Sequence, residues 1–196
     1  KEGENPDYIC KLIRTDSVKE FIEYDKKTKI SYYVKPSFFE TNPFLYYQIE
    51  LLEYTAFYGS IEIFKYLQKK NPYELSHGTY YNKLFISAIH SNNFEFFQLI
   101  EKSFAIERDH QEILEESIKC YHNEIAKYFA DIMLKKNIQV DYNLNLVRFH
   151  NFDFWPKDSN DKSMFCILCK HDYYVIVKSM INDVDINEVH TIIIRF

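Results

Sequence analysis

Apolar residues recur at helical spacing in five stretches of the chain, and a short polar break divides each stretch in two. Residues 51–67 show the pattern most clearly and read LLEYTAFYGSIEIFKYL, with Gly59 in the break. Before the break, Leu52, Thr55 and Ala56 share one face of a helix, and a second apolar face begins after it. Each stretch therefore predicts two short helices that are joined by a tight turn.

The same pattern recurs at residues 8–24, 51–67, 84–100, 113–129 and 164–180. Aligning the five copies places the turns at Asp16, Gly59, Asn92, Tyr121 and Asp172, at intervals of 43, 33, 29 and 51 residues. Helices of about ten residues are marginal alone, so each pair must bury its apolar face against a neighbour. The sequence therefore predicts an all-α helix–turn–helix repeat solenoid, with about five irregular repeats in one domain over residues 1–196.

Two longer connections interrupt the repeats. Residues 29–47 contain Ser37 and Glu40, which have the spacing of a capping box at the start of a helix. Residues 137–161 are too apolar for a solvated linker, and they predict an extra helix over residues 143–150.

Residues 52–59, followed by Ile63, Phe64 and Leu67, resemble an ankyrin repeat, which has a Leu-x-x-Ala-Ala-x-x-Gly turn and a period of 33. The whole arrangement most resembles an uncharacterised ankyrin-like family that is expanded in some protists. Residues 52–67, 87–93 and 118–123 carry this resemblance, which extends over residues 9–187. The Thr-Pro-Leu-His opening is missing from every copy, so we expect plain loops in place of β-hairpin fingers. The resemblance implies a stacked solenoid that binds proteins and has no catalytic chemistry.

The resemblance also implies where a partner binds. In ankyrin-like stacks, the two residues before each turn line the concave surface. Carried over to this chain, the positions that we expect to contact a partner are Arg14, Phe57, Tyr58, His90, Lys119, Lys170 and His171. They are basic or aromatic, although the chain has a net charge of −5. Because aromatic residues and arginine are enriched at interface hot spots, we expect a protein partner with an acidic or polar surface.

Composition narrows the other possibilities. With 24 Lys+Arg against 29 Asp+Glu, the chain lacks the basic excess that neutralises phosphates, so we expect no nucleic-acid partner. No apolar run approaches the roughly 20 residues that span a bilayer, so we expect no membrane partner. Four cysteines do not make a disulfide scaffold, and the chain has no Asn-x-Ser/Thr sequon, which together favour a cytoplasmic protein.

Cys166 and Cys169 are the strongest local signal for a different function. They have the Cys-x-x-Cys spacing of metal and redox sites, and His171 is close enough in sequence to be a third zinc ligand. In the repeat alignment, however, Cys169 occupies the small buried position of Ala56, which favours a core role. Our preferred hypothesis is a non-enzymatic scaffold without cofactor or small-molecule substrate. The alternative is a cysteine-dependent enzyme or small zinc site built on these three residues.

Overall fold

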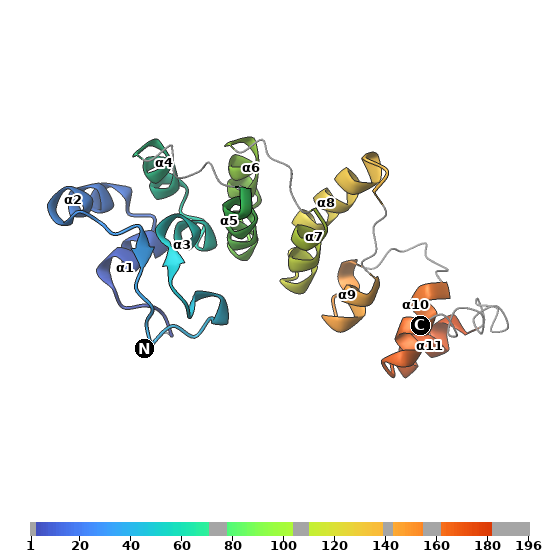
Figure 1. Cartoon of the computed structure of the whole chain (residues 1–196). Coiled ribbons are helices and arrows are strands. Elements are labelled where there is room, and N and C mark those ends of the chain that lie inside the picture. Colours follow the sequence, from blue (N-terminus) through green and yellow to red (C-terminus); the bar gives the residue numbers. More distant parts are fainter. Residues whose placement is uncertain (1–2, 71–77, 104–109, 139–142, 155–161, 182–196) are drawn as a thin grey trace. The chain divides into compact units, whose positions relative to one another are not determined.

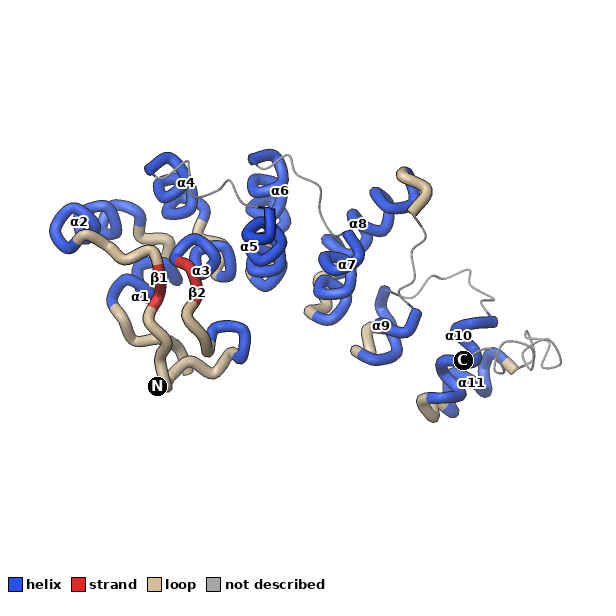
Figure 2. Tube along the Cα trace, in the orientation of Figure 1, coloured by secondary structure: helices blue, strands red, loops and turns tan. Residues whose placement is uncertain are grey.

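The computed structural model of the chain describes residues 3–70, 78–103, 110–138, 143–154 and 162–181 (Figure 1). Within these residues the chain is mostly helical, with eleven α-helices and one two-stranded sheet (Figure 2), which confirms the all-α prediction. None of the described helices combines the length and apolar character that crossing a bilayer requires. The contacts divide the chain into two compact units, Lys1–Asp109 and His110–Phe196, which are described separately.

The described residues of unit 1 form three helix pairs, which coincide with the first three predicted copies of the repeat. The helices are α1 (Tyr8–Arg14), α2 (Val18–Thr28), α3 (Leu51–Phe57), α4 (Ile61–Lys70), α5 (Gly78–His90) and α6 (Phe94–Ser103). A long connection between α2 and α3 holds the short strands β1 (Tyr33–Val34) and β2 (Ile49–Glu50) and the 3-10 helix η1 (Pro43–Leu45). The two strands pair in antiparallel fashion, with Tyr33 opposite Glu50.

Unit 2 contains two helix pairs at the last two predicted positions, together with one additional helix. The pairs are α7 (His110–Lys119) with α8 (Asn123–Lys135) and α10 (Lys162–Lys170) with α11 (Tyr174–Met180). Between them lie α9 (Asn143–Arg148) and the 3-10 helix η2 (Phe152–Phe154), so the extra helix that the sequence predicts is present. Helix α9 packs against α7 and α10. The buried Asn151 donates a hydrogen bond of 2.8 Å from its side-chain amide to the carbonyl of Ile118.

The turn inside every pair has the same left-handed backbone. The residues at the five predicted turn positions have φ angles of +46° (Asp16), +67° (Gly59), +50° (Asn92), +61° (Tyr121) and +59° (Asp172). At the first turn, the Asp16 N–H donates to the Ile13 carbonyl (2.9 Å) and the Ser17 N–H donates to the Leu12 carbonyl (3.0 Å), which is a Schellman motif. The same two bonds recur at Gly59, Tyr121 and Asp172. Four of the five turns thus form without glycine, in a conformation that is unfavourable for residues with a Cβ atom.

Asp16 also joins the first helix pair to the second. Its two carboxylate oxygens accept hydrogen bonds of 3.0 Å each from the backbone N–H groups of Glu62 and Ile63, in the first turn of α4. The local N-cap candidate, Ser60, is buried and instead donates its hydroxyl to the carbonyl of Ile13. The N-terminus of α4 is therefore capped by a side chain that lies 46 residues earlier in the chain.

The core is formed by the apolar faces that the repeat pattern predicts. In unit 1, α3 packs against α5, and Ala56 of α3 is completely buried. Phenylalanines fill the space between the later helices, and the rings of Phe64 and Phe96 meet edge to face with centroids 5.0 Å apart. In unit 2, a comparable set of buried apolar residues includes Leu114, Phe129 and Leu146.

The capping box that the sequence predicts at Ser37 and Glu40 is wrong, because this segment is a turn and no helix begins there. The Glu40 carboxylate instead accepts hydrogen bonds from the backbone N–H groups of Asn5 and Asn42, at 3.3 Å each. A capping box is found at the start of α3, where Glu50 is the N-cap and its backbone N–H donates to the Glu53 carboxylate (3.1 Å). Glutamate is an unusual N-cap residue, which is why the sequence pattern did not reveal it.

Candidate partner-binding surface

The four predicted partner-binding residues of unit 1 form a continuous row. The guanidinium carbon of Arg14 lies 6.0 Å from the ring centroid of Tyr58. The Tyr58 and Phe57 rings are 5.2 Å apart, and the Phe57 ring stacks on His90 at 5.1 Å with an angle of 20° between the planes. All four side chains are half-buried. Residues from the ends of α1, α3 and α5 therefore meet on one partly exposed surface, which we name the aromatic row.

Phe44 extends the aromatic row, although the sequence analysis did not select it. Its ring stacks on Phe57 with centroids 5.8 Å apart and lies 4.9 Å from His90. Phe44 belongs to η1, whose start is capped by Asn42 through a bond of 2.9 Å from the Phe44 N–H. Asn42 followed by Pro43 is a local signal for that helical turn. No local signal reveals that the turn packs against α3 and α5, because that contact depends on the path of the whole connection.

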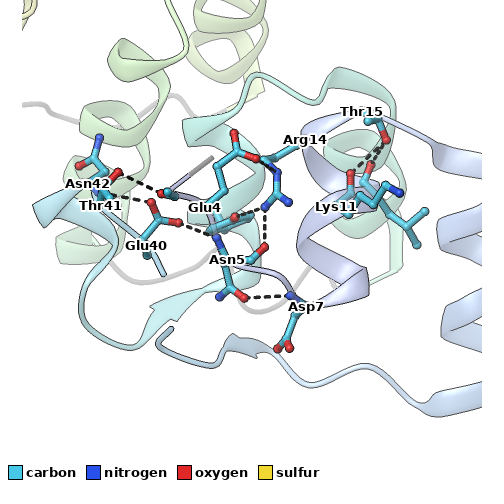
Figure 3. A network of polar contacts seen from close by, with 12 residues as sticks. Glu4, Asn5, Asp7, Lys11, Arg14, Thr15, Glu40, Thr41 and Asn42 are labelled. Atoms are coloured by element: carbon cyan, nitrogen blue, oxygen red, sulfur yellow. Dashed lines mark hydrogen bonds and ion pairs between the residues drawn. The ribbon is translucent and has the colours of Figure 1, made fainter. Parts of the chain in front are cut away.

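Arg14 is engaged inside the protein. Its Nε atom pairs with the Glu4 carboxylate (2.9 Å), and its Nη1 atom donates to the Asn5 carbonyl (2.9 Å) (Figure 3). The same Nη1 atom also donates to the Tyr54 hydroxyl (3.1 Å). Burial by itself would lower the pKa of Arg14, but the bond to Tyr54 and the nearby Glu4 charge outweigh it and raise the pKa. Arg14 thus remains charged and supports Tyr58, and its donors are directed to groups of unit 1.

Tyr58 and Phe57 contribute to stability as well as to the surface. Both pack against the core cluster that contains Cys10 and Tyr54. The Tyr58 ring lies 4.9 Å from that of Tyr54, and burial raises the pKa of the Tyr58 hydroxyl. Because Tyr58 is half-buried, its removal costs folding energy, and binding tests at this position need a stability control.

The predicted residues of unit 2 are exposed. Lys119 is the last residue of α7, and its ammonium group lies 3.0 Å from the carboxylate of Glu116. Lys170 is the last residue of α10, and His171 follows it at the start of the turn. Within the described part of unit 2, no hydrogen bond or ion pair joins Lys119 to Lys170 or His171. The side chains of Lys119, Lys170 and His171 are accessible to a partner. They do not form a row of side chains in contact with one another, unlike the four predicted residues of unit 1.

The structure does not assemble the alternative site. The possible ligand atoms of Cys166, Cys169 and His171, all described residues, do not gather within 4.8 Å of one another. Cys169 is exposed, whereas the repeat alignment predicts a buried core position. Ala56 lies on α3, which packs against the next helix pair through α5, whereas no helix pair follows α11 among the described residues.

The thiols of Cys10, which is buried, and Cys120, which is half-buried, are not activated nucleophiles. Burial raises the pKa of the Cys10 thiol to about 11. Burial, together with the negative charge of Glu116, raises the pKa of Cys120 to about 12. A catalytic cysteine needs a lowered pKa because the thiolate is the reactive form, and both of these thiols are protonated at neutral pH.

Comparisons of the chain with protein-family models, with curated proteins and with solved structures found no match. The ankyrin-like resemblance therefore rests on the residues of the chain itself, above all on residues 52–67 and the recurring turns.

Proposed function

We propose that the chain is an ankyrin-like repeat protein of about five helix pairs that binds a protein partner in the cytoplasm. It acts without a cofactor or catalytic chemistry. The partner contacts are Phe57, Tyr58 and His90 in unit 1 and Lys119, Lys170 and His171 in unit 2. Arg14, which is half-buried and lies 6.0 Å from the centroid of the Tyr58 ring, completes the contacts of unit 1.

The observation that carries this proposal is the aromatic row. Aromatic rings that are half-buried and stacked on one another lose little side-chain entropy when a partner covers them, because their rotamers are already restricted. Such rings are typical of binding hot spots, whereas exposed lysines mainly attract the partner and are screened by salt. The stacked rings of Phe57, His90 and Phe44 are therefore suited to be a binding hot spot. The exposed Lys119 and Lys170 are suited to attract an acidic partner.

The raised pKa values of the Cys10, Cys120 and Cys169 thiols do not favour a cysteine-dependent enzyme at these residues. A nucleophilic cysteine would need a neighbouring cation or a helix N-terminus to stabilise the thiolate. Cys120 instead lies beside Glu116, with 3.7 Å between its sulfur and the carboxylate. That neighbour makes the thiolate less stable.

The experiment is a binding measurement with a partner isolated by the parent protein. The variant Lys119→Glu/Lys170→Glu reverses two exposed charges at the predicted surface. The matched control Lys127→Glu/Lys135→Glu makes the same change in charge at two exposed positions of α8, the second helix of its pair. We expect the first variant to slow association at low salt and the control to associate like the parent. High salt should reduce the difference, because screening shortens the range of the charges.

A second measurement tests the aromatic row. His90→Ala should speed dissociation, because it removes a stacked ring from the contact. A parent-like unfolding midpoint in urea would show that the change acts on binding rather than on folding. Loss of binding in the α8 control, with normal binding by both other variants, would place the interface on the second helices and refute the proposal.

A further inference from the structure

The connection between α2 and α3 presents two phenylalanines to solvent at the tip of a turn. Phe38 and Phe39 are the central residues of the turn Ser37–Glu40, and their exposed fractions are 109% and 51%. Large apolar side chains are normally at least partly covered, since burial of a phenylalanine is strongly favourable. We name Phe38 and Phe39 the aromatic tip, because Phe38 extends fully away from the rest of unit 1.

Hydrogen bonds hold the aromatic tip in place from both sides. Before the tip, the Asn5 side-chain amide donates to the Lys35 carbonyl at 2.8 Å. After it, the Asn5 N–H donates to the Glu40 carboxylate (3.3 Å), and the Thr41 N–H donates to the Gly3 carbonyl (2.9 Å) (Figure 3). Asn5 and Glu40 are only 3% and 4% exposed. These bonds fix the backbone on both sides of the aromatic tip. Binding through the tip would therefore cost little conformational entropy of the backbone.

The charges of the connection favour a negatively charged surface. In the connection, residues 29–50, the exposed charged side chains are Lys29 and Lys35; of the two carboxylates, Glu40 is buried and Glu50 is half-buried as the N-cap of α3. In the neighbouring N-terminal segment, Glu4 is paired with Arg14, which leaves Asp7 as an exposed acid at the start of α1. Four tyrosines of the same connection are also exposed, with fractions between 48% and 81%: Tyr32, Tyr33, Tyr46 and Tyr47.

We propose that the aromatic tip docks this protein onto the surface of an anionic lipid bilayer. A projecting apolar tip can enter the acyl region, tyrosine suits the interface with its apolar ring and polar hydroxyl, and lysine is attracted to anionic headgroups. A pocket on another protein would also accept a phenylalanine. It would not explain why the same connection exposes four tyrosines and two lysines and has no fully exposed acidic side chain. Attachment to a bilayer surface needs no membrane-spanning helix. The sequence-based expectation of no membrane partner considered spanning segments alone, so it does not exclude this kind of attachment.

The test uses the full-length protein and vesicles of two compositions, phosphatidylcholine alone and phosphatidylcholine with phosphatidylserine at 3:1. We expect the parent to sediment with the anionic vesicles, and Phe38→Ser to reduce the partition coefficient about tenfold or more, because one phenylalanine no longer leaves water. Lys35→Glu should weaken binding to anionic vesicles and leave binding to neutral vesicles unchanged. Val175→Ser is the matched control, because Val175 is an apolar residue of α11 that is 80% exposed.

A second readout follows the tip directly. In the variant Phe38→Trp, the fluorescence of the new indole should shift to the blue on mixing with anionic vesicles and should be quenched by brominated acyl chains. Failure of the parent to bind either vesicle would overturn the proposal, as would equal binding by the parent and Phe38→Ser. If vesicles do not bind while Phe38→Ser abolishes binding to a protein partner, the tip belongs to a protein interface. None of these outcomes bears on the aromatic row, whose test uses other residues.

Discussion

The capping of α4 by Asp16 provides the sharpest test of how the helix pairs are joined. Asp16 accepts 3.0 Å hydrogen bonds from the N–H groups of Glu62 and Ile63, while its own backbone has a φ of +46°. Replacing it with alanine removes the cap and leaves a Cβ atom in the left-handed region. Loss of a capping side chain costs about 0.5–2 kcal/mol, and loss of a negative charge at a helix N-terminus costs about 0.3–1 kcal/mol. We therefore expect Asp16→Ala to lower the free energy of unfolding by about 2 kcal/mol.

A matched variant separates the cap from the backbone conformation. Asp172 has a φ of +59° in the corresponding turn of α10–α11, and its side chain caps no helix within the described residues. Asp172→Ala therefore meets the same left-handed backbone without losing a cap. Asp16→Asn keeps one acceptor oxygen, so it can cap only one of the two N–H groups, and it also loses the charge; we expect it to cost about 1 kcal/mol, less than Asp16→Ala.

Urea unfolding, monitored by far-ultraviolet circular dichroism, measures these differences through the midpoint and its slope. Hydrogen exchange of the Glu62 and Ile63 amides provides a local readout, and we expect it to accelerate in Asp16→Ala alone. If Asp16→Ala and Asp172→Ala lose the same stability, and the two amides remain protected, the cap has no energetic role. The first turn would then not stabilise the second helix pair through this cap.

Three further predictions concern the interior of unit 1. Ala56→Phe should lose about 1–3 kcal/mol of stability through overpacking, since Ala56 is completely buried, and an unchanged urea midpoint would contradict the packing of α3 on α5. Because the pKa of Cys10 is raised to about 11, this thiol should react slowly with a thiol reagent at pH 8 and rapidly in urea. Cys120, whose pKa is raised to about 12, should also react slowly, so Cys10→Ser should reduce the amplitude of the slow phase by one thiol, and an unchanged amplitude would contradict the assignment. Burial by itself would raise the pKa of Asp25, but hydrogen bonds from Lys70 and Tyr66 outweigh it and lower the pKa. The Asp25 carboxylate therefore stabilises the folded protein above about pH 3.9, the pKa of an unfolded aspartate, and this stabilisation is lost as the pH falls further. The stability difference between the parent and Asp25→Asn should shrink accordingly in acid, and a constant difference would exclude this linkage.

The helix pairs and turns could be predicted because their signals are local. Apolar residues at a spacing of three and four lie on one face of a helix, and a break in that pattern marks the turn. Even Tyr121, which has no intrinsic preference for a left-handed backbone, was located by its place in the repeat. At Gly59 the residue type alone also predicts the left-handed backbone, because glycine has no Cβ atom. The alignment of the copies was therefore more informative than the propensity of single residues.

The environment of the candidate surface was harder to predict because it depends on contacts between distant segments. Arg14 was expected to face a partner, but Glu4 and Asn5 of the N-terminal segment and Tyr54 of α3 all bind its guanidinium group. Phe44 joined the aromatic row from a connection that has no counterpart in the other repeats. A repeat alignment describes the positions that copies share, so it says nothing of side chains supplied by a unique insertion.

The bonds that cross from the first helix pair to the second also have a consequence for synthesis on the ribosome. The Ile13 carbonyl and the Asp16 carboxylate receive their donors from Ser60, Glu62 and Ile63, which are translated 46 or 47 residues later. Until those residues emerge, the first pair lacks its partners and its apolar face is uncovered. Domains generally fold as units during translation. The first pair should therefore stay unfinished until α4 leaves the exit tunnel, so α1–α4 is the smallest N-terminal segment that can complete its own bonds.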